Sequence, residues 1–162
     1  MTQTTPLGAL ARGLVAGFAG TVAMTGYQLT VAKLRGQPNK KPRRWADAPV
    51  PAQLAKRVSE GVFEHKVKLA DEKKLTNLVH FSYGTSWGAV YGLAQATLHA
   101  PTLAHGLGFG TAVWGTAYAV LPPTGLYEPP WKYPVKELAF DLSHHLVYGV
   151  AVAGAYRALE RL

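Results

Sequence analysis

The chain of 162 residues contains no cysteine, and two long stretches of it contain no formal charge. Without cysteine, the protein has no disulfide, zinc thiolate site, iron–sulfur cluster or cysteine nucleophile. No Lys, Arg, Asp or Glu occurs between Arg12 and Lys33, or between Lys74 and Glu128. A water-soluble helical domain carries charges along the outer face of each helix. The segregation of charge therefore indicates polar connections between apolar spans that are buried in lipid.

The common motifs of soluble enzymes are also missing. The chain has no Gly-x-Ser-x-Gly elbow and no paired carboxylates in an apolar segment. Gly106, Gly108 and Gly110 alternate with other residues, but a phosphate-binding loop needs a different spacing and a preceding strand. The sequence favours a protein without enzymatic activity. It predicts no catalytic residue and no metal ligand, and the favoured expectation is a protein without a cofactor.

Four apolar segments are long enough to cross a bilayer as helices, at about 20 residues per crossing. They predict an all-α integral membrane four-helix bundle in a single domain. Between the first two segments lies most of the positive charge, including a stretch over 53–74 with the pattern of an amphipathic helix. Because cytoplasmic loops are rich in Lys and Arg, this connection is expected inside and both termini outside. The predicted spans are 7–34, 75–98, 103–121 and 135–158, and the basic cytoplasmic loop is 35–74.

Glycines recur at helical spacing inside these segments. Glycine costs about 1 kcal/mol in a helix interior in water, so rows of it need a physical reason. In a bilayer, rows of small residues let two helix backbones approach closely. The glycines predicted to pack helices together are Gly13, Gly17, Gly84, Gly88, Gly92 and Gly149.

A short motif occurs twice, as His80-x-x-Tyr83-Gly84 and as His145-x-x-Tyr148-Gly149. A weaker match joins the first and third segments, at Gly20-Thr21 and Gly110-Thr111. Two successive helical hairpins keep the same orientation in a membrane. The matches therefore predict two αα-hairpins that form a parallel repeat.

The repeat places His80 and His145 at corresponding positions, where they would face each other at similar depth. Two such imidazoles suit the axial ligation of a b-type haem, or a quinone site. Asp141 lies one turn before His145 and is expected to fix its tautomer, and Asp141, His144 and His145 form a candidate proton relay. The alternative is that each histidine hydrogen-bonds a neighbouring helix and has a purely structural role.

Three of these motifs together resemble the YagU-like inner-membrane proteins, a family of small multispan proteins. The motifs are Gly20-Thr21-x-x-Met24, the stretch from His80 to Gly92, and His145-x-x-Tyr148-Gly149. The resemblance implies four helices in a bacterial inner membrane. It brings no catalytic residues, because the family has no established chemistry.

The sequence thus favours a non-enzymatic accessory or scaffold subunit that packs against other helices of a larger inner-membrane complex. The alternative is a haem-binding, quinone-binding or proton-relay module, and a small transporter or channel stays open. The expected partners are the lipid bilayer and a membrane protein or a second copy of the chain. Anionic lipid is a candidate at Lys40–Arg44, whereas nucleic acid is not expected there, since such clusters are common in cytoplasmic loops.

Overall fold

The computed structural model describes residues 5–36, 41–98 and 101–161. Within these residues the chain forms five α-helices and no strand, which confirms the all-α class. By length and hydropathy, one helix in the described part of the chain, α1, could cross a membrane; the others are less apolar or shorter. The five helices are α1 (Pro6–Leu34), α2 (Val50–Gly61), α3 (Glu72–Thr97), α4 (Thr102–Val120) and α5 (Val135–Leu159).

Proline sets most of the helix starts. Pro6 occupies the first turn of α1, and the Thr5 side chain caps it by accepting a 3.1 Å bond from the Gly8 amide. Helices α4 and α5 begin directly after Pro101 and Pro134. Proline has no amide hydrogen to donate and its φ suits the entry to a helix, so these positions favour a defined start.

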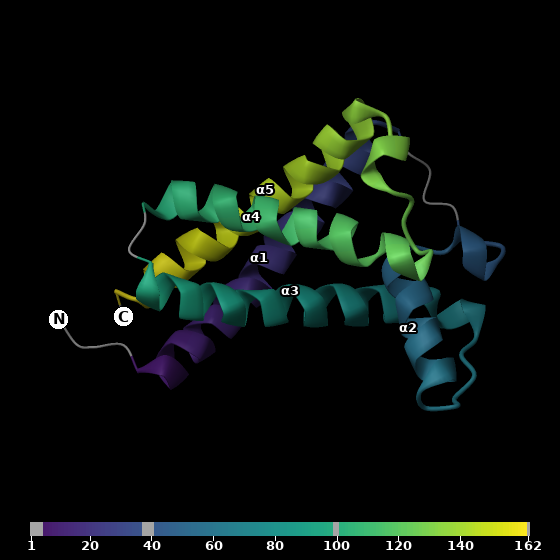
Figure 1. Cartoon of the computed structure of the whole chain (residues 1–162), viewed down its shortest axis with the longest axis horizontal. Helices are drawn as coiled ribbons and strands as arrows, with labels where there is room; N and C mark the ends of the chain where they lie inside the picture. The colour runs from purple at the N-terminus through teal and green to yellow at the C-terminus, as the bar shows by residue number, and fades with distance from the viewer. Residues whose placement is uncertain (1–4, 37–40, 99–100, 162) are drawn as a thin grey trace.

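The four long helices lie beside one another (Figure 1). Helix α1 begins and α5 ends at one end of the molecule, where α3 also ends and α4 begins. The opposite end, called the connection end below, holds the segments 41–71 and 121–134. There α2 packs on α3 and runs across the direction of the long helices. Arg57 of α2 donates a hydrogen bond to the Thr124 carbonyl, which joins the two connecting segments.

Two pairs of long helices touch backbone to backbone through glycine. In the α1–α3 pair, a Cβ added to Gly17 would lie 2.7 Å from the Cα of Gly88. In the α4–α5 pair, a Cβ added to Gly149 would lie 2.6 Å from the Gly110 nitrogen. No side chain fits at such separations. Of the glycines predicted to pack helices together, Gly13, Gly17, Gly88, Gly92 and Gly149 lie at contacts of this kind, and Gly84 packs against the Thr21 side chain of α1.

Helices α3 and α4 are separated by aromatic side chains instead. Phe109 of α4 packs against Trp87 and Tyr91 of α3, with ring centroids 6.1 and 5.0 Å apart. Tyr156 of α5 meets Tyr91 at 5.6 Å, and both are 1% exposed. This aromatic layer forms the centre of the hydrophobic core.

The amphipathic helix expected over 53–74 is shorter than the pattern suggested. Helix α2 ends at Gly61, and Glu64 has a positive φ of 52° that reverses the chain. The His65 amide then bonds the Ser59 carbonyl at 2.9 Å. Glycine followed by this turn interrupts the helix, so the apolar residues beyond it do not continue the same face.

Candidate functional site at the connection end

A group of polar side chains inside the long helices lies near the connection end, and a second group, Gln95 with His105 and Tyr91, lies near the opposite end. Each long helix contributes at least one side chain to the group at the connection end, within three turns of its own terminus there. The members of this group are Thr25 and Tyr27 of α1, His80 of α3, Tyr118 of α4, and Asp141, Ser143, His144 and His145 of α5.

His80 is held by a hydroxyl of α1. Its Nε2 lies 3.3 Å from the Thr25 Oγ1. The Thr25 hydroxyl already donates its hydrogen to the Thr21 carbonyl at 2.8 Å, so it accepts from the imidazole. Neutral His80 therefore carries its hydrogen on Nε2 and keeps a lone pair on Nδ1.

His145 has the opposite tautomer. Its Nδ1 lies 3.0 Å from the backbone carbonyl oxygen of Asp141, which can only accept a hydrogen bond. Neutral His145 is therefore protonated on Nδ1 and keeps a lone pair on Nε2. The sequence assigned this orienting role to the Asp141 carboxylate, but the backbone of the same residue performs it.

The Asp141 carboxylate contacts tyrosine instead. The Tyr118 hydroxyl donates to it at 3.2 Å. The Tyr118 ring packs against Tyr127 and Tyr133 at centroid distances of 5.2 and 5.7 Å, and these three residues are called the tyrosine cluster. Burial raises the pKa of Tyr127, in the connecting segment, to about 12, and the nearby negative charge of Asp141 adds to the shift. The cluster therefore covers the carboxylate from the connection side.

His144 points to a different side of α5, towards α1. Only 8% of it is exposed, and its ring packs against Phe140 at 4.4 Å and Tyr27 at 5.4 Å. Its Nε2 is buried without a hydrogen-bond partner in the described part of the chain. Ser143 donates to the Phe140 carbonyl at 2.6 Å, so the Tyr27 hydroxyl donates to Ser143 at 3.4 Å.

These contacts do not form a continuous relay. No hydrogen bond between described residues joins the Asp141 carboxylate to His144 or His145. His80 and His145 do lie within electrostatic reach of each other. Among the residues that the structure describes, no group of three or more His, Asp or Glu could hold a metal ion.

The glycine contacts give a second way to compare the two helix pairs. Gly88 meets Gly13 and Gly17, as Gly149 meets Gly106 and Gly110. In this comparison Gly88 corresponds to Gly149, whereas the repeated sequence motif aligns Gly84 with Gly149. The repeat of packing and the repeat of sequence thus differ by one helical turn.

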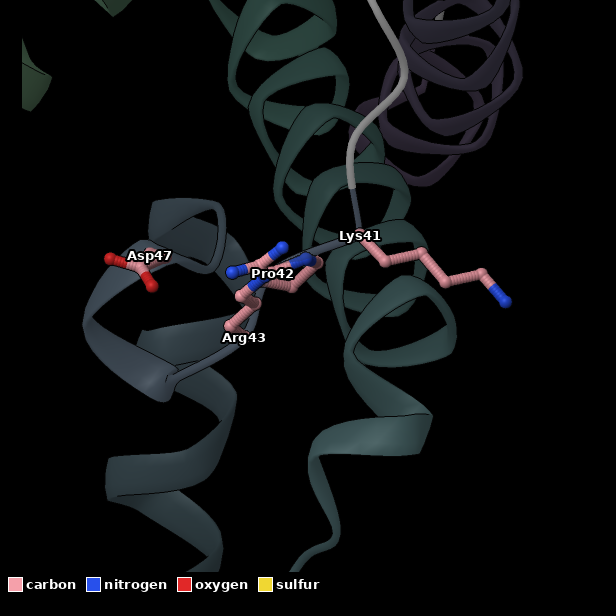
Figure 2. Close-up of a pocket in the computed structure, with 4 residues that line it drawn as sticks. All are labelled: Lys41, Pro42, Arg43 and Asp47. Carbon is pink, nitrogen blue, oxygen red and sulfur yellow. The ribbon is translucent and has the colours of Figure 1, made fainter.

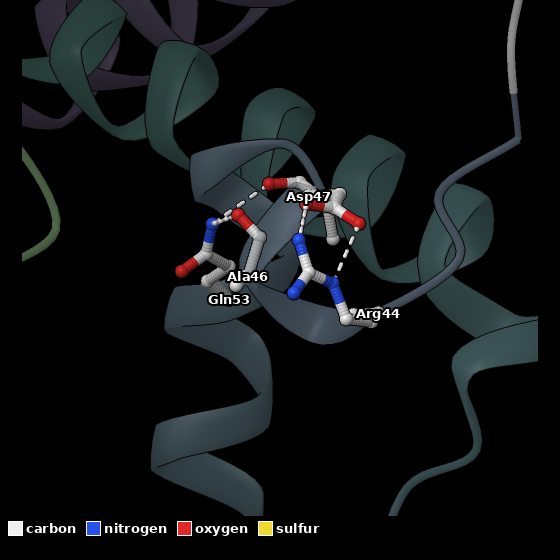
Figure 3. Close-up of polar contacts among 5 residues, drawn as sticks. Arg44, Ala46, Asp47 and Gln53 are labelled. Atoms are coloured by element: carbon white, nitrogen blue, oxygen red, sulfur yellow. Dashed lines mark hydrogen bonds and ion pairs between the residues drawn. The ribbon is translucent and has the colours of Figure 1, made fainter.

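Two contacts hold the basic segment 41–48 in place: an ion pair within it, and a hydrogen bond from a side-chain amide of α2. Lys41, Pro42, Arg43 and Asp47 line an open pocket, in which the Lys41 side chain points away from Asp47 (Figure 2). Arg44 holds Asp47 through two hydrogen bonds of 3.1 and 3.2 Å (Figure 3). This contact lowers the pKa of the Asp47 carboxyl from its usual value.

The second contact comes from α2, where the Gln53 side-chain amide donates a hydrogen bond to the Ala48 carbonyl at 2.8 Å (Figure 3). This bond closes the segment 44–48 onto the first turns of α2. Lys40, the first residue of the candidate lipid site at Lys40–Arg44, lies outside the described residues.

The sequence did not indicate the hydroxyl-bearing residues of the site, which are Thr25, Tyr27, Tyr118, Ser143 and the covering Tyr127 and Tyr133. One local signal could have indicated Thr25, since a threonine one turn after Thr21 places a second hydroxyl inside the same apolar segment. Tyr127 belongs to a connection rich in aromatics and proline, a pattern that is typical of an anchor at the membrane interface. Its contact with Tyr118 depends on how the chain returns over α4, and no local pattern encodes that.

Comparisons with protein-family models, with curated proteins and with solved structures found no match to this chain. The candidate site therefore rests on the geometry described above.

Proposed function

We propose that the chain is a four-span protein of a bacterial inner membrane, with α1, α3, α4 and α5 crossing the bilayer. The observation that carries this proposal is the apolar outer surface of these helices. In the most apolar 18-residue window of α1 only 39% is buried. An apolar helix at the core of a soluble protein would be mostly buried, because exposing such side chains to water is costly. Exposed examples are Val15 (57%), Phe18 (53%), Val90 (50%) and Leu103 (62%).

The distribution of basic residues supports an orientation with the connection end in the cytoplasm. In the described part of the chain, the Lys and Arg residues that lie away from that end are Arg12, Arg157 and Arg161. An excess of Lys and Arg marks the cytoplasmic side. The resemblance to YagU-like proteins is part of the same proposal, as is the arrangement of α1/α3 and α4/α5 as two parallel hairpin repeats.

For its role, we favour an accessory or scaffold subunit that packs against a helix of another membrane protein or of a second copy. The glycine rows at the α1–α3 and α4–α5 contacts are used within the chain, so they do not supply a partner surface. The outer face of α4 differs. A Cβ at Gly108 or Gly115 would meet no atom within 4 Å, and Ala104, Gly108 and Ala112 line a shallow apolar groove. Internal packing does not explain these glycines, whereas a docked helix would.

Co-purification from native membranes in mild detergent tests this role. Gly108→Leu should abolish recovery of the partner, because the leucine fills the groove. Ala19→Leu adds the same kind of side chain to the exposed outer face of α1 and serves as the matched control. Equal recovery from both variants and the wild type would count against a partner on α4.

The second candidate is a proton-handling or cofactor module built on His80 and His145. The observation that favours it is that each imidazole uses one nitrogen in a hydrogen bond and keeps a lone pair on the other. This is the state in which a histidine binds a metal or accepts a proton. A Soret band in the purified protein that disappears in His145→Ala would support haem. A colourless protein would leave the scaffold role as the better proposal.

A further inference from the structure

Helix α2 and the turn after it expose apolar side chains at the connection end. On one side, Ala52 is fully buried where α2 packs on α3. On another side, Val58 is 43% exposed, Val62 70% and Phe63 73%. Val62 lies one helical turn after Val58, and Phe63 follows it directly, so the three form one apolar edge that no other described residue covers.

This edge is held in place rather than carried on a loose tail. Ser59 and His65 join the two arms of the turn through two hydrogen bonds, of 2.9 and 2.8 Å. Glu64 adopts a positive φ of 52°, a conformation that is uncommon for a residue other than glycine. The Arg57 bond to Thr124 fixes α2 to the other connecting segment. The turn therefore presents Val62 and Phe63 in a defined direction.

Basic side chains outnumber acidic ones beside the edge, where Glu64 is the one exposed carboxylate of the turn and two other carboxylates are already paired. Glu60 pairs with Lys56, and Asp47 pairs with Arg44. Lys66 and Lys68 follow the turn and are exposed, as are Lys41 and Arg43 near the start of α2. The surface beside the apolar edge is therefore positive.

We propose that α2, with Val62 and Phe63, lies in the headgroup layer of the cytoplasmic leaflet and binds anionic phospholipid there. This inference rests on the proposed membrane placement of the long helices. Since α2 runs across those helices, it lies along the plane of a bilayer that they cross (Figure 1). A helix with one apolar edge and a basic flank binds such an interface by burying the edge and pairing its cations with lipid phosphate.

The absence of cysteine allows a direct test with the full chain in lipid nanodiscs. A fluorophore on Val62→Cys reports on the edge, and one on Val22→Cys reports on the exposed outer face of α1. Lipids that carry a spin label near the headgroup should quench the Val62 probe. Lipids labelled deep in the acyl chain should quench the Val22 probe.

A second arm tests the charge. At equal mole fraction, spin-labelled phosphatidylserine should quench the Val62 probe more than spin-labelled phosphatidylcholine does. The double variant Lys66→Gln/Lys68→Gln should lose most of this preference. Arg161→Gln, which removes an exposed arginine from the opposite end, should keep it.

The outcomes separate the two proposals. If the Val22 probe is not quenched, the membrane placement itself is overturned. If Val22 is quenched but Val62 is not, only the inference about α2 is overturned. It is also overturned if the preference for phosphatidylserine is absent in the wild type, or if the Val62 probe is shielded from lipid by a co-purified protein.

Discussion

The Tyr148 hydroxyl on α5 donates a 2.6 Å hydrogen bond to the backbone carbonyl oxygen of Gly84 on α3. Tyr148 is 2% exposed, so the bond forms away from water. A carbonyl oxygen has two lone pairs and can accept this bond in addition to the bond within its own helix. The contact ties together two helices that otherwise meet only sparsely.

Tyr148→Phe should destabilise the protein by about 1 kcal/mol, the usual net value of a buried hydrogen bond. Tyr156→Phe is the matched control, because its hydroxyl reaches the Gly92 carbonyl at a longer 3.4 Å. Thermal unfolding in one detergent measures both variants. If the two variants lose the same stability, the length of the hydrogen bond does not determine its contribution.

Gly88→Ala should destabilise the protein by ~1–3 kcal/mol, because the new Cβ overlaps the backbone of Gly13 and Gly17. Gly108→Ala should leave the stability unchanged or raise it, since its Cβ meets open space. Melting temperatures of the two variants, compared with the wild type, test the α1–α3 contact. Similar melting temperatures for all three proteins would contradict it.

Single cysteines should label from opposite sides of the membrane according to their end of the molecule. Ala46→Cys and Thr124→Cys, at the connection end, should react from the cytoplasm. Thr102→Cys and Arg161→Cys should react from outside. The measurement is blocking by a membrane-impermeant thiol reagent in intact cells, followed by labelling after lysis. If Arg161→Cys is protected and Ala46→Cys reacts in intact cells, the orientation is the opposite of the one proposed.

Tyr127 should ionise at a pH well above that at which an ordinary tyrosine ionises. Burial raises its pKa to about 12 in the folded protein, from 10.0 for an exposed tyrosine. A raised pKa means that the neutral hydroxyl is favoured by folding. This contribution to stability is present below pH 10 and is lost as the pH rises towards about 12.

The difference in tyrosinate absorbance between the wild type and Tyr127→Phe isolates this titration. Asp141→Asn should lower the Tyr127 pKa, because it removes the nearby negative charge. An unchanged titration in Asp141→Asn would show that burial alone causes the shift.

The positions of the long helices follow from the sequence because local signals mark their ends. Proline lies directly before α4 and α5, and the expected spans differ from the observed helices by no more than three residues at each end. The glycine contacts were also predictable, since a row of glycines in a helix has few explanations other than close packing. Only the choice of partner helix for each row required the structure.

The candidate site was less predictable, because its contacts join residues far apart in the chain. Thr25 and His80 are 55 positions apart, and nothing local to either indicates the other. In the repeated motif His80 corresponds to His145 and Gly84 to Gly149. In the backbone contacts it is Gly88 that corresponds to Gly149. A one-turn offset between two motifs is invisible in sequence, because small residues recur at every turn of these helices.

The contrast between the glycine contacts and the aromatic layer has a mechanical consequence. Where backbones touch, as at Gly17 and Gly88, two helices cannot come closer, and they can separate only by losing the whole contact at once. Where rings fill the space, as at Tyr91 and Phe109, the separation can change through side-chain rotation while contact is kept. The spacings within the α1–α3 and α4–α5 pairs are therefore stiff, whereas the spacing between α3 and α4 is compliant.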